Sequence, residues 1–107
     1  MTNHLTTHIL DATAGTPAAG VEVVLTAPSG DEIARGLTDG DGRLGLGPAV
    51  LVPGSYALSF ATGAYFEGLG VEAFYPTVRV DFAVGERAHY HVPLLLSPFA
   101  YSTYRGS

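Results

Sequence analysis

The sequence has 107 residues, a length that suits one domain spanning 1–107. With ten acidic residues, five arginines and no lysine, the formal net charge is −5, and without a Lys/Arg run we expect no binding to nucleic acid. A hydrophobic content of 47% excludes a disordered chain, and a mean hydropathy of +0.26 predicts an unusually apolar surface or one covered by other subunits.

Glycine and proline divide the first part of the chain into short segments whose apolar residues alternate with period two, as in strands. We expect strands over residues 5–10, 21–26, 32–37, 43–46 and 55–61. Turns at 13–17, 28–31 and 39–42 separate them. The Asp39-Gly-Asp-Gly42 turn is the strongest of these signals, because Asp-Gly tolerates positive φ.

Residues 62–70 break the alternation and predict one or two turns of helix. Thr62 is the expected N-cap, and a glycine ends the helix. Tyr65, Phe66 and Leu69 would share its inner side.

Strands are expected again over 78–84, 88–96 and 100–104. The total of about eight short strands and one short helix indicates an all-β fold, an antiparallel β-sandwich.

The four histidines fall on two of these strands. His4 and His8 share one face of the first strand, and His89 and His91 share one face of the strand over 88–96. The opposite face of the later strand carries Tyr90, Val92, Leu94 and Leu96 and is expected to be core. The histidines are therefore placed on an outer face, with His4 at a frayed end of the chain.

Isolated surface histidines are the simplest explanation of this pattern. A His-x-His pair with a third histidine on another strand is also compatible with a three-histidine zinc site. That spacing is common by chance, and no carboxylate is placed to support a zinc ligand.

Two arginines and a serine are further candidates. Arg43 directly follows the turn at 39–42, and Arg105 precedes Gly106 and Ser107. Each arginine could form an ordinary surface ion pair, but guanidinium is also well shaped to bind anionic or carbonyl-rich ligands. Without a G-x-S-x-G motif, Ser107 is expected to bind by hydrogen bonds and not to act as a nucleophile.

The acidic residues show no paired-carboxylate pattern. Glu67, Glu72, Asp81 and Glu86 are expected on the solvated surface, and Asp11 in a turn.

The sequence indicates the cellular compartment only indirectly. Cysteine is absent, which removes disulfides and cysteine metal sites and is compatible with a reducing compartment. No signal peptide is recognisable, and no apolar stretch approaches the roughly 20 residues of a membrane helix. We expect a cytoplasmic protein without membrane association.

Two segments carry a family resemblance. His8-Ile-Leu-Asp11 followed by Gly15-Thr-Pro17-Ala18 resembles the N-terminal signature of the transthyretin family, and Tyr90-His-Val-Pro-Leu-Leu-Leu-Ser-Pro98 with Phe99-Ala-Tyr-Ser-Thr103 resembles its C-terminal signature. The resemblance covers nearly the whole chain. It is specific to the 5-hydroxyisourate hydrolase branch, which carries counterparts of His8, Arg43, His91 and the Tyr104–Ser107 tail.

The resemblance implies a transthyretin-like sandwich and a homotetramer built as a dimer of dimers, with active sites in the channel between dimers. It implies hydrolysis of 5-hydroxyisourate in urate catabolism, without cofactor or metal. It implies catalytic roles for His8, Arg43, His91 and Ser107 and substrate binding by Tyr104, Arg105 and Gly106, and leaves His89 as a neighbour. The alternative is a non-catalytic carrier of a small aromatic ligand in the same channel.

Overall fold

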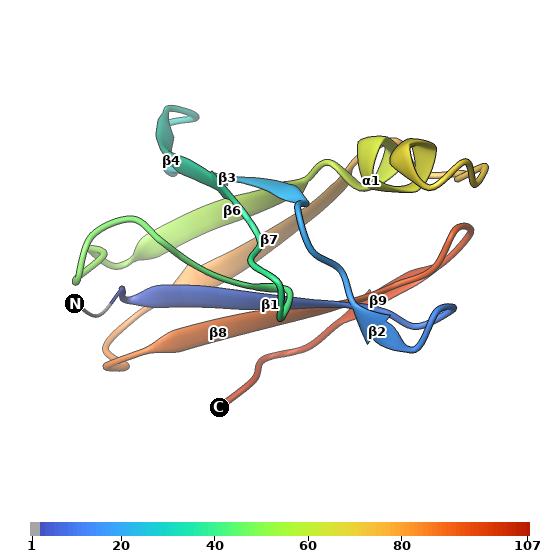
Figure 1. Ribbon diagram of the computed structural model, residues 1–107. Helices are drawn as coiled ribbons and strands as arrows, with labels where there is room; N and C mark the ends of the chain where they lie inside the picture. Colours follow the sequence, from blue (N-terminus) through green and yellow to red (C-terminus); the bar gives the residue numbers. More distant parts are fainter. Residues whose placement is uncertain (1–2) are drawn as a thin grey trace.

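The computed structural model describes residues 3–107 as two β-sheets packed face to face, with one short helix at one end (Figure 1). The strands in chain order are β1 Leu5–Asp11, β2 Thr16–Pro17, β3 Glu22–Thr26, β4 Glu32–Leu37, β5 Arg43–Leu46, β6 Gly54–Phe60, β7 Val78–Val84, β8 Tyr90–Leu96 and β9 Tyr101–Thr103. The helix is α1 Thr62–Gly68. The predicted elements are all present, and the two-residue β2 lies inside an expected turn.

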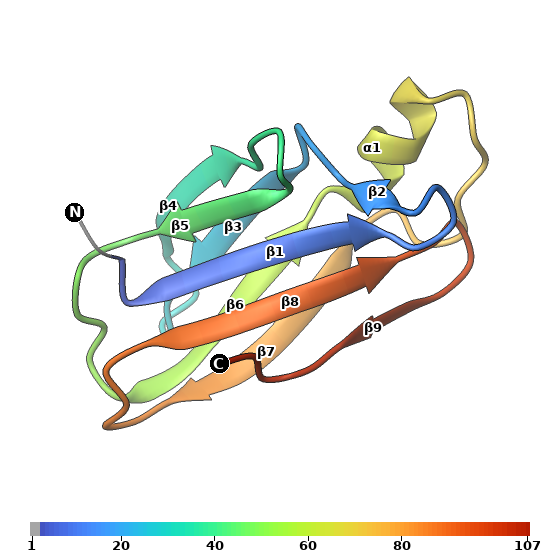
Figure 2. The same cartoon turned by 60° about the horizontal axis from the view of Figure 1, so that its bottom comes forward.

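One sheet has the order β2-β1-β8-β9, with β5 also paired to β1, and the other has the order β4-β3-β6-β7. Every pair is antiparallel except β1 with β8, which is parallel over its whole length. Parallel neighbours need a long connection, and here the intervening chain builds the entire second sheet. Figure 2 shows β1 and β8 side by side at the centre of their sheet.

The core lies between the sheets and follows the predicted alternation. Along β1, buried and half-buried residues alternate without interruption, and β8 buries the face that carries Tyr90, Val92, Leu94 and Leu96. The opposite face of β1 and β8 consequently points away from the core and carries Thr6, His8 and His91. This outer face is the surface on which the candidate site is built.

The helix ends at Gly68, one of the two glycines expected there, but its start and its inner side depart from the prediction. Ala61, not Thr62, is the N-cap residue, and Thr62 is buried with its hydroxyl donating to the Tyr75 carbonyl at 3.1 Å. Leu69 follows the helix and is 56% exposed, because the chain leaves the sandwich surface there. Within residues 3–107, no helix is long and apolar enough to cross a membrane.

His4 was expected at a frayed, solvent-exposed end, and that prediction is wrong. The side chain is only 5% exposed. Its Nδ1 accepts from the Leu51 N–H at 2.7 Å, and its Nε2 donates to the Arg87 carbonyl at 2.7 Å. His4 thus ties the loop before β6 to the loop before β8, a role that alternation along one strand does not reveal.

Asp11 is the other buried charged residue. Its Oδ1 accepts from the N–H groups of Thr13 and Ala14, as expected for a turn residue. Its Oδ2 accepts from the Tyr65 hydroxyl at 2.9 Å, which anchors α1 to the end of β1. Burial, followed by this carboxylate, raises the pKa of Tyr65 to about 12.

We predict that His4→Ala lowers the free energy of unfolding by about 2 kcal/mol, because a backbone donor and a backbone acceptor lose their partner. Urea denaturation at one fixed protein concentration measures the effect. The exposed His89→Ala variant is the matched control and should change stability by less than about 0.5 kcal/mol. Equal stability of the two variants would contradict the bridging role.

Candidate active site

Strand register assembles the candidate site from three separate parts of the sequence. In the parallel β1–β8 pair Thr6 lies opposite His91, and in the antiparallel β1–β5 pair His8 lies opposite Arg43. Because side chains on one face recur every second residue, these pairings gather imidazole, hydroxyl and guanidinium groups on the outer face of one sheet.

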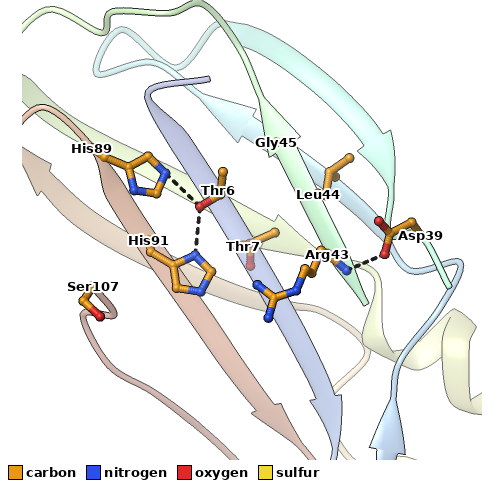
Figure 3. A pocket seen from close by; sticks show the side chains of 9 residues that line it. All are labelled: Thr6, Thr7, Asp39, Arg43, Leu44, Gly45, His89, His91 and Ser107. Atoms are coloured by element: carbon orange, nitrogen blue, oxygen red, sulfur yellow. Dashed lines mark hydrogen bonds between the residues drawn. The ribbon is translucent and has the colours of Figure 1, made fainter. Parts of the chain in front are cut away.

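A cavity of about 300 Å³ opens on this face. It has a size suited to a small ligand. Figure 3 shows the lining side chains, which come from β1, β5, the turn before β5, the start of β8 and the tail. They are Thr6, Thr7, Asp39, Arg43, Leu44, Gly45, His89, His91 and Ser107.

The turn before β5 positions Arg43. Asp39 Oδ1 accepts from the N–H groups of Asp41 and Arg43, both at 2.9 Å. These donors, led by the Arg43 N–H, hold the pKa of the Asp39 carboxyl below its usual range. Gly42 has φ +75°, and an added Cβ would collide with the Ile9 carbonyl, so this turn can lie against β1 only with glycine there.

His91 is half-buried at the cavity and has its Nδ1 at 2.8 Å from the Thr6 hydroxyl. Its pKa is lowered from the ordinary value, first by burial and then by the positive charges of Arg43, His89 and His8, while its contact with Thr6 acts in the opposite direction. The imidazole is therefore neutral at pH 7, and Nε2 is the ring nitrogen left free to exchange a proton with a ligand.

His8 lies on the same outer face but does not line the cavity. Its Nε2 donates to the Asp41 carbonyl at 2.9 Å. A carbonyl can only accept, so the hydrogen of the neutral ring is on Nε2 and the lone pair is on Nδ1. The resemblance gives catalytic roles to four residues. Three of them line the cavity, and His8 lies outside it on the same face of the sheet.

The tail crosses the outer face beside β8. The Gly106 N–H donates to the His91 carbonyl at 2.8 Å. A Cβ on Gly106 would lie 2.5 Å from His91 Cδ2 and 3.2 Å from Pro93 Cγ, so glycine allows the tail to rest on the imidazole. This contact brings Ser107 to the cavity. Tyr104 and Arg105 instead line a second cavity, of about 280 Å³, that extends to β7.

The five arginines fall into different environments. Arg35 pairs with Glu22 and Glu32, and Arg79 pairs with Asp81, as ordinary surface charges do. Among residues 3–107, the side chains of Arg43, Arg87 and Arg105 have no ion-pair partner, and of these only Arg43 lines the cavity. The cavity thus contains a guanidinium whose hydrogen-bond donors are available to a ligand.

A metal site finds no geometric support in this face. The described part of the chain contains no group of three or more His, Asp or Glu side chains arranged to hold an ion. His89 and His91 are stacked, with ring centroids 6.4 Å apart, and both contact the Thr6 hydroxyl. The His-x-His pair therefore shares a hydroxyl.

The comparison with known families settles the relationship. The family model described as "HIUase/Transthyretin family" matches residues 5–106. The chain belongs to this family. The 5-hydroxyisourate hydrolase of Salmonella dublin is 47% identical over 98% of this chain and 82% of its own length.

Solved structures of the HIUase/Transthyretin family include both kinds of relative. The Klebsiella pneumoniae 5-hydroxyisourate hydrolase superposes with a TM-score of 0.88 at 42% identity, covering 96% of this chain and 98% of the other. Sea bream transthyretin, solved in complex with thyroxine, superposes with a TM-score of 0.87 at 33% identity, covering 96% and 94%. Backbone similarity therefore does not separate enzyme from carrier, and the side chains on the outer face must do so.

Sequence reasoning missed several residues that line the cavity. Thr6 shares a face of the first strand with His8 but belongs to no recognisable motif, and Asp39 was considered only as part of a turn. The signal for Thr6 was its even spacing from His8, but its contact with His91 depends on the parallel β1–β8 register. No local pattern contains that register.

We predict that His91 titrates below its ordinary pKa of about 6.5, as measured by NMR of the imidazole resonances across pH. Arg43→Gln should raise the pKa of His91, because removing a nearby positive charge favours the protonated ring. Arg79→Gln, whose guanidinium is exposed and paired with Asp81, is the control and should leave it unchanged. A midpoint at or above 6.5 in the unmodified protein would contradict this electrostatic picture.

Proposed function

We propose that this protein hydrolyses 5-hydroxyisourate to 2-oxo-4-hydroxy-4-carboxy-5-ureidoimidazoline, a step of urate catabolism. The single observation that carries the proposal is the cavity in which Arg43, His91 and Ser107 meet. A guanidinium without an ionic partner beside a neutral imidazole suits a polar, carbonyl-rich ring and the proton transfers of hydrolysis. Relatives with 5-hydroxyisourate hydrolase in their names support the substrate.

The chemistry assigns each group a task. Water adds to the carbonyl carbon of the ring amide, and the carbonyl oxygen becomes an oxyanion that Arg43 stabilises by charge and hydrogen bonds. The C–N bond then breaks, and the leaving nitrogen receives a proton. His8 and His91 carry out the proton transfers between them, since each imidazole has one ring nitrogen that makes no hydrogen bond within the protein. Neither step calls on a metal or cofactor.

The tail completes the site in this proposal. Ser107 reaches the cavity by way of the Gly106–His91 contact and orients the substrate through hydrogen bonds. Tyr104 and Arg105 line the neighbouring cavity, which shares His91 with the first, and they bind the substrate from that side.

A homotetramer built as a dimer of dimers is part of the proposal. β7 and β9 each end their sheet and present an unpaired edge. Large apolar side chains near these edges are exposed, among them Phe74 (69%), Phe99 (62%) and Tyr104 (58%). Such a surface suits burial against further copies of the chain. The channel between dimers would then enclose the outer face and bring His8 close to the substrate.

We also propose a cytoplasmic location, because a chain without cysteine suits a reducing compartment.

A direct assay separates the enzyme from a carrier of a small aromatic ligand. 5-Hydroxyisourate is generated with urate oxidase, and its ultraviolet decay is followed with and without the protein. We expect acceleration by the unmodified protein and a loss of about 10²–10⁴-fold in His91→Asn, the range for one positioned proton-transfer group. Decay at the spontaneous rate with the unmodified protein would favour the carrier.

We predict that Gly106→Ala lowers turnover about 100-fold while the protein stays folded, because the added methyl group displaces either His91 or the tail by about an ångström. Gly68→Ala is the matched control, since a Cβ there has open space around it. The same ultraviolet assay and circular dichroism check both variants. Normal turnover in Gly106→Ala would show that the tail is not needed at this position.

A further inference from the structure

The Thr6 hydroxyl lies between two imidazoles. Its Oγ1 is 2.8 Å from His91 Nδ1 and 3.0 Å from His89 Nε2 (Figure 3). Both histidines line the cavity, and in the single chain His91 is half-buried whereas His89 is exposed at its rim. We propose that His89, Thr6 and His91 form a proton relay that connects the reacting end of His91 to solvent, an inference that rests on the proposed hydrolase function.

The hydrogen-bonding capacity of the three groups allows one consistent chain. A hydroxyl donates one hydrogen and accepts at its lone pairs, and a neutral imidazole has one donor and one acceptor. If Thr6 donates to His91 Nδ1, then His89 Nε2–H donates to Thr6, and the His91 hydrogen is on Nε2. Moving one proton along each bond, while His91 Nε2 loses its hydrogen and His89 Nδ1 gains one, gives the other consistent state, in which His91 carries its hydrogen on Nδ1. Both states are neutral and fully hydrogen-bonded.

The two states correspond to the acid and base forms that hydrolysis needs. When His91 gives its Nε2 proton to the leaving nitrogen, Nδ1 takes the Thr6 proton, Thr6 takes the His89 Nε2 proton, and His89 takes one from water at Nδ1. When His91 Nε2 takes a proton from the attacking water, each transfer reverses and one proton leaves through His89. No step leaves a net charge on His91.

Electrostatics favours transfer through the chain over storing a second proton on His91. Burial of this imidazole acts first, and the charges of Arg43 on β5, His89 just before β8 and His8 on β1 act in the same direction. The product is also a carboxylic acid that is ionised at neutral pH, so one proton must reach solvent in every turnover. Because Nδ1 of His91 is occupied by Thr6, that path is separate from the nitrogen that meets the substrate.

Thr6 is consequently a positioning residue as well as a link in the relay. Its hydroxyl holds the His91 ring in one orientation, and the parallel register places Thr6 directly across from His91. Valine at this position keeps the shape and removes the hydroxyl, whereas serine keeps the hydroxyl.

The test compares Thr6→Val, Thr6→Ser and the control Thr26→Val, a substitution in β3 of the other sheet. We expect Thr6→Val to lower kcat at least about tenfold with KM changed less than about twofold, because proton transfer and not binding is lost. Thr6→Ser should recover most of kcat, and Thr26→Val should match the unmodified protein. Equal kcat in Thr6→Val and the unmodified protein, or equal losses in the valine and serine variants, would overturn the relay.

His89→Ala tests the solvent end. We expect kcat to fall and then to rise again as imidazole buffer is added, because a small proton carrier replaces the missing ring, while the unmodified protein does not respond. Full activity in His89→Ala without imidazole would overturn the relay even if Thr6→Val is impaired. Failure of the relay is distinct from failure of the proposed function, in which the unmodified protein itself would not accelerate hydrolysis.

Discussion

The parallel pairing of β1 with β8 is the constraint on which the candidate site depends. It sets Thr6 across from His91, and the antiparallel pairing of β5 on the other edge of β1 sets Arg43 across from His8. A shift of either strand by one residue would turn every side chain to the opposite face and would place the polar groups in the core. The buried apolar residues that lock the register, such as Ile9 and Leu94, therefore also hold the catalytic geometry.

The electrostatic character of the outer face depends on Arg43, whose guanidinium has no carboxylate partner among residues 3–107. Arg35 and Arg79 have carboxylate partners on the surface. Arg43 is positioned through its backbone by Asp39, so its guanidinium stays available. Burial of the His91 ring and then the positive charge of Arg43 lower the pKa of His91, which favours the neutral ring. One arrangement thus prepares both the anion-stabilising group and the proton-transfer group.

The hydrogen-bonding requirements of buried groups explain where sequence reasoning failed. Thr62 fits the N-cap preference, but its hydroxyl is used by the Tyr75 carbonyl instead. His4 is two residues before Thr6 and fits the alternation of an outer face, yet it is buried between two loops that the sequence places far away. In both cases a distant backbone group that needed a partner outweighed the local preference. The strands were predicted well because each one carries its own alternation.

By itself, the sequence determined the strands, the turn that precedes Arg43, the outer-face location of His8 and His91, and the family resemblance. These features follow from period-two patterning, from the conformations open to Asp-Gly, and from short motifs, all of which are local. Only the tertiary structure decided that Thr6 joins His89 to His91, that Gly106 rests on the His91 ring, and that His4 is a buried bridge. The contacts of Thr6 with the two histidines and of His4 with Arg87 join residues more than 80 positions apart. The contact of Gly106 with the His91 ring forms only when the tail folds back onto the sheet. Sheet register causes the Thr6 contacts, and backbone groups that need partners cause those of His4. Both arise only when the whole core packs, and no single segment of the sequence contains them.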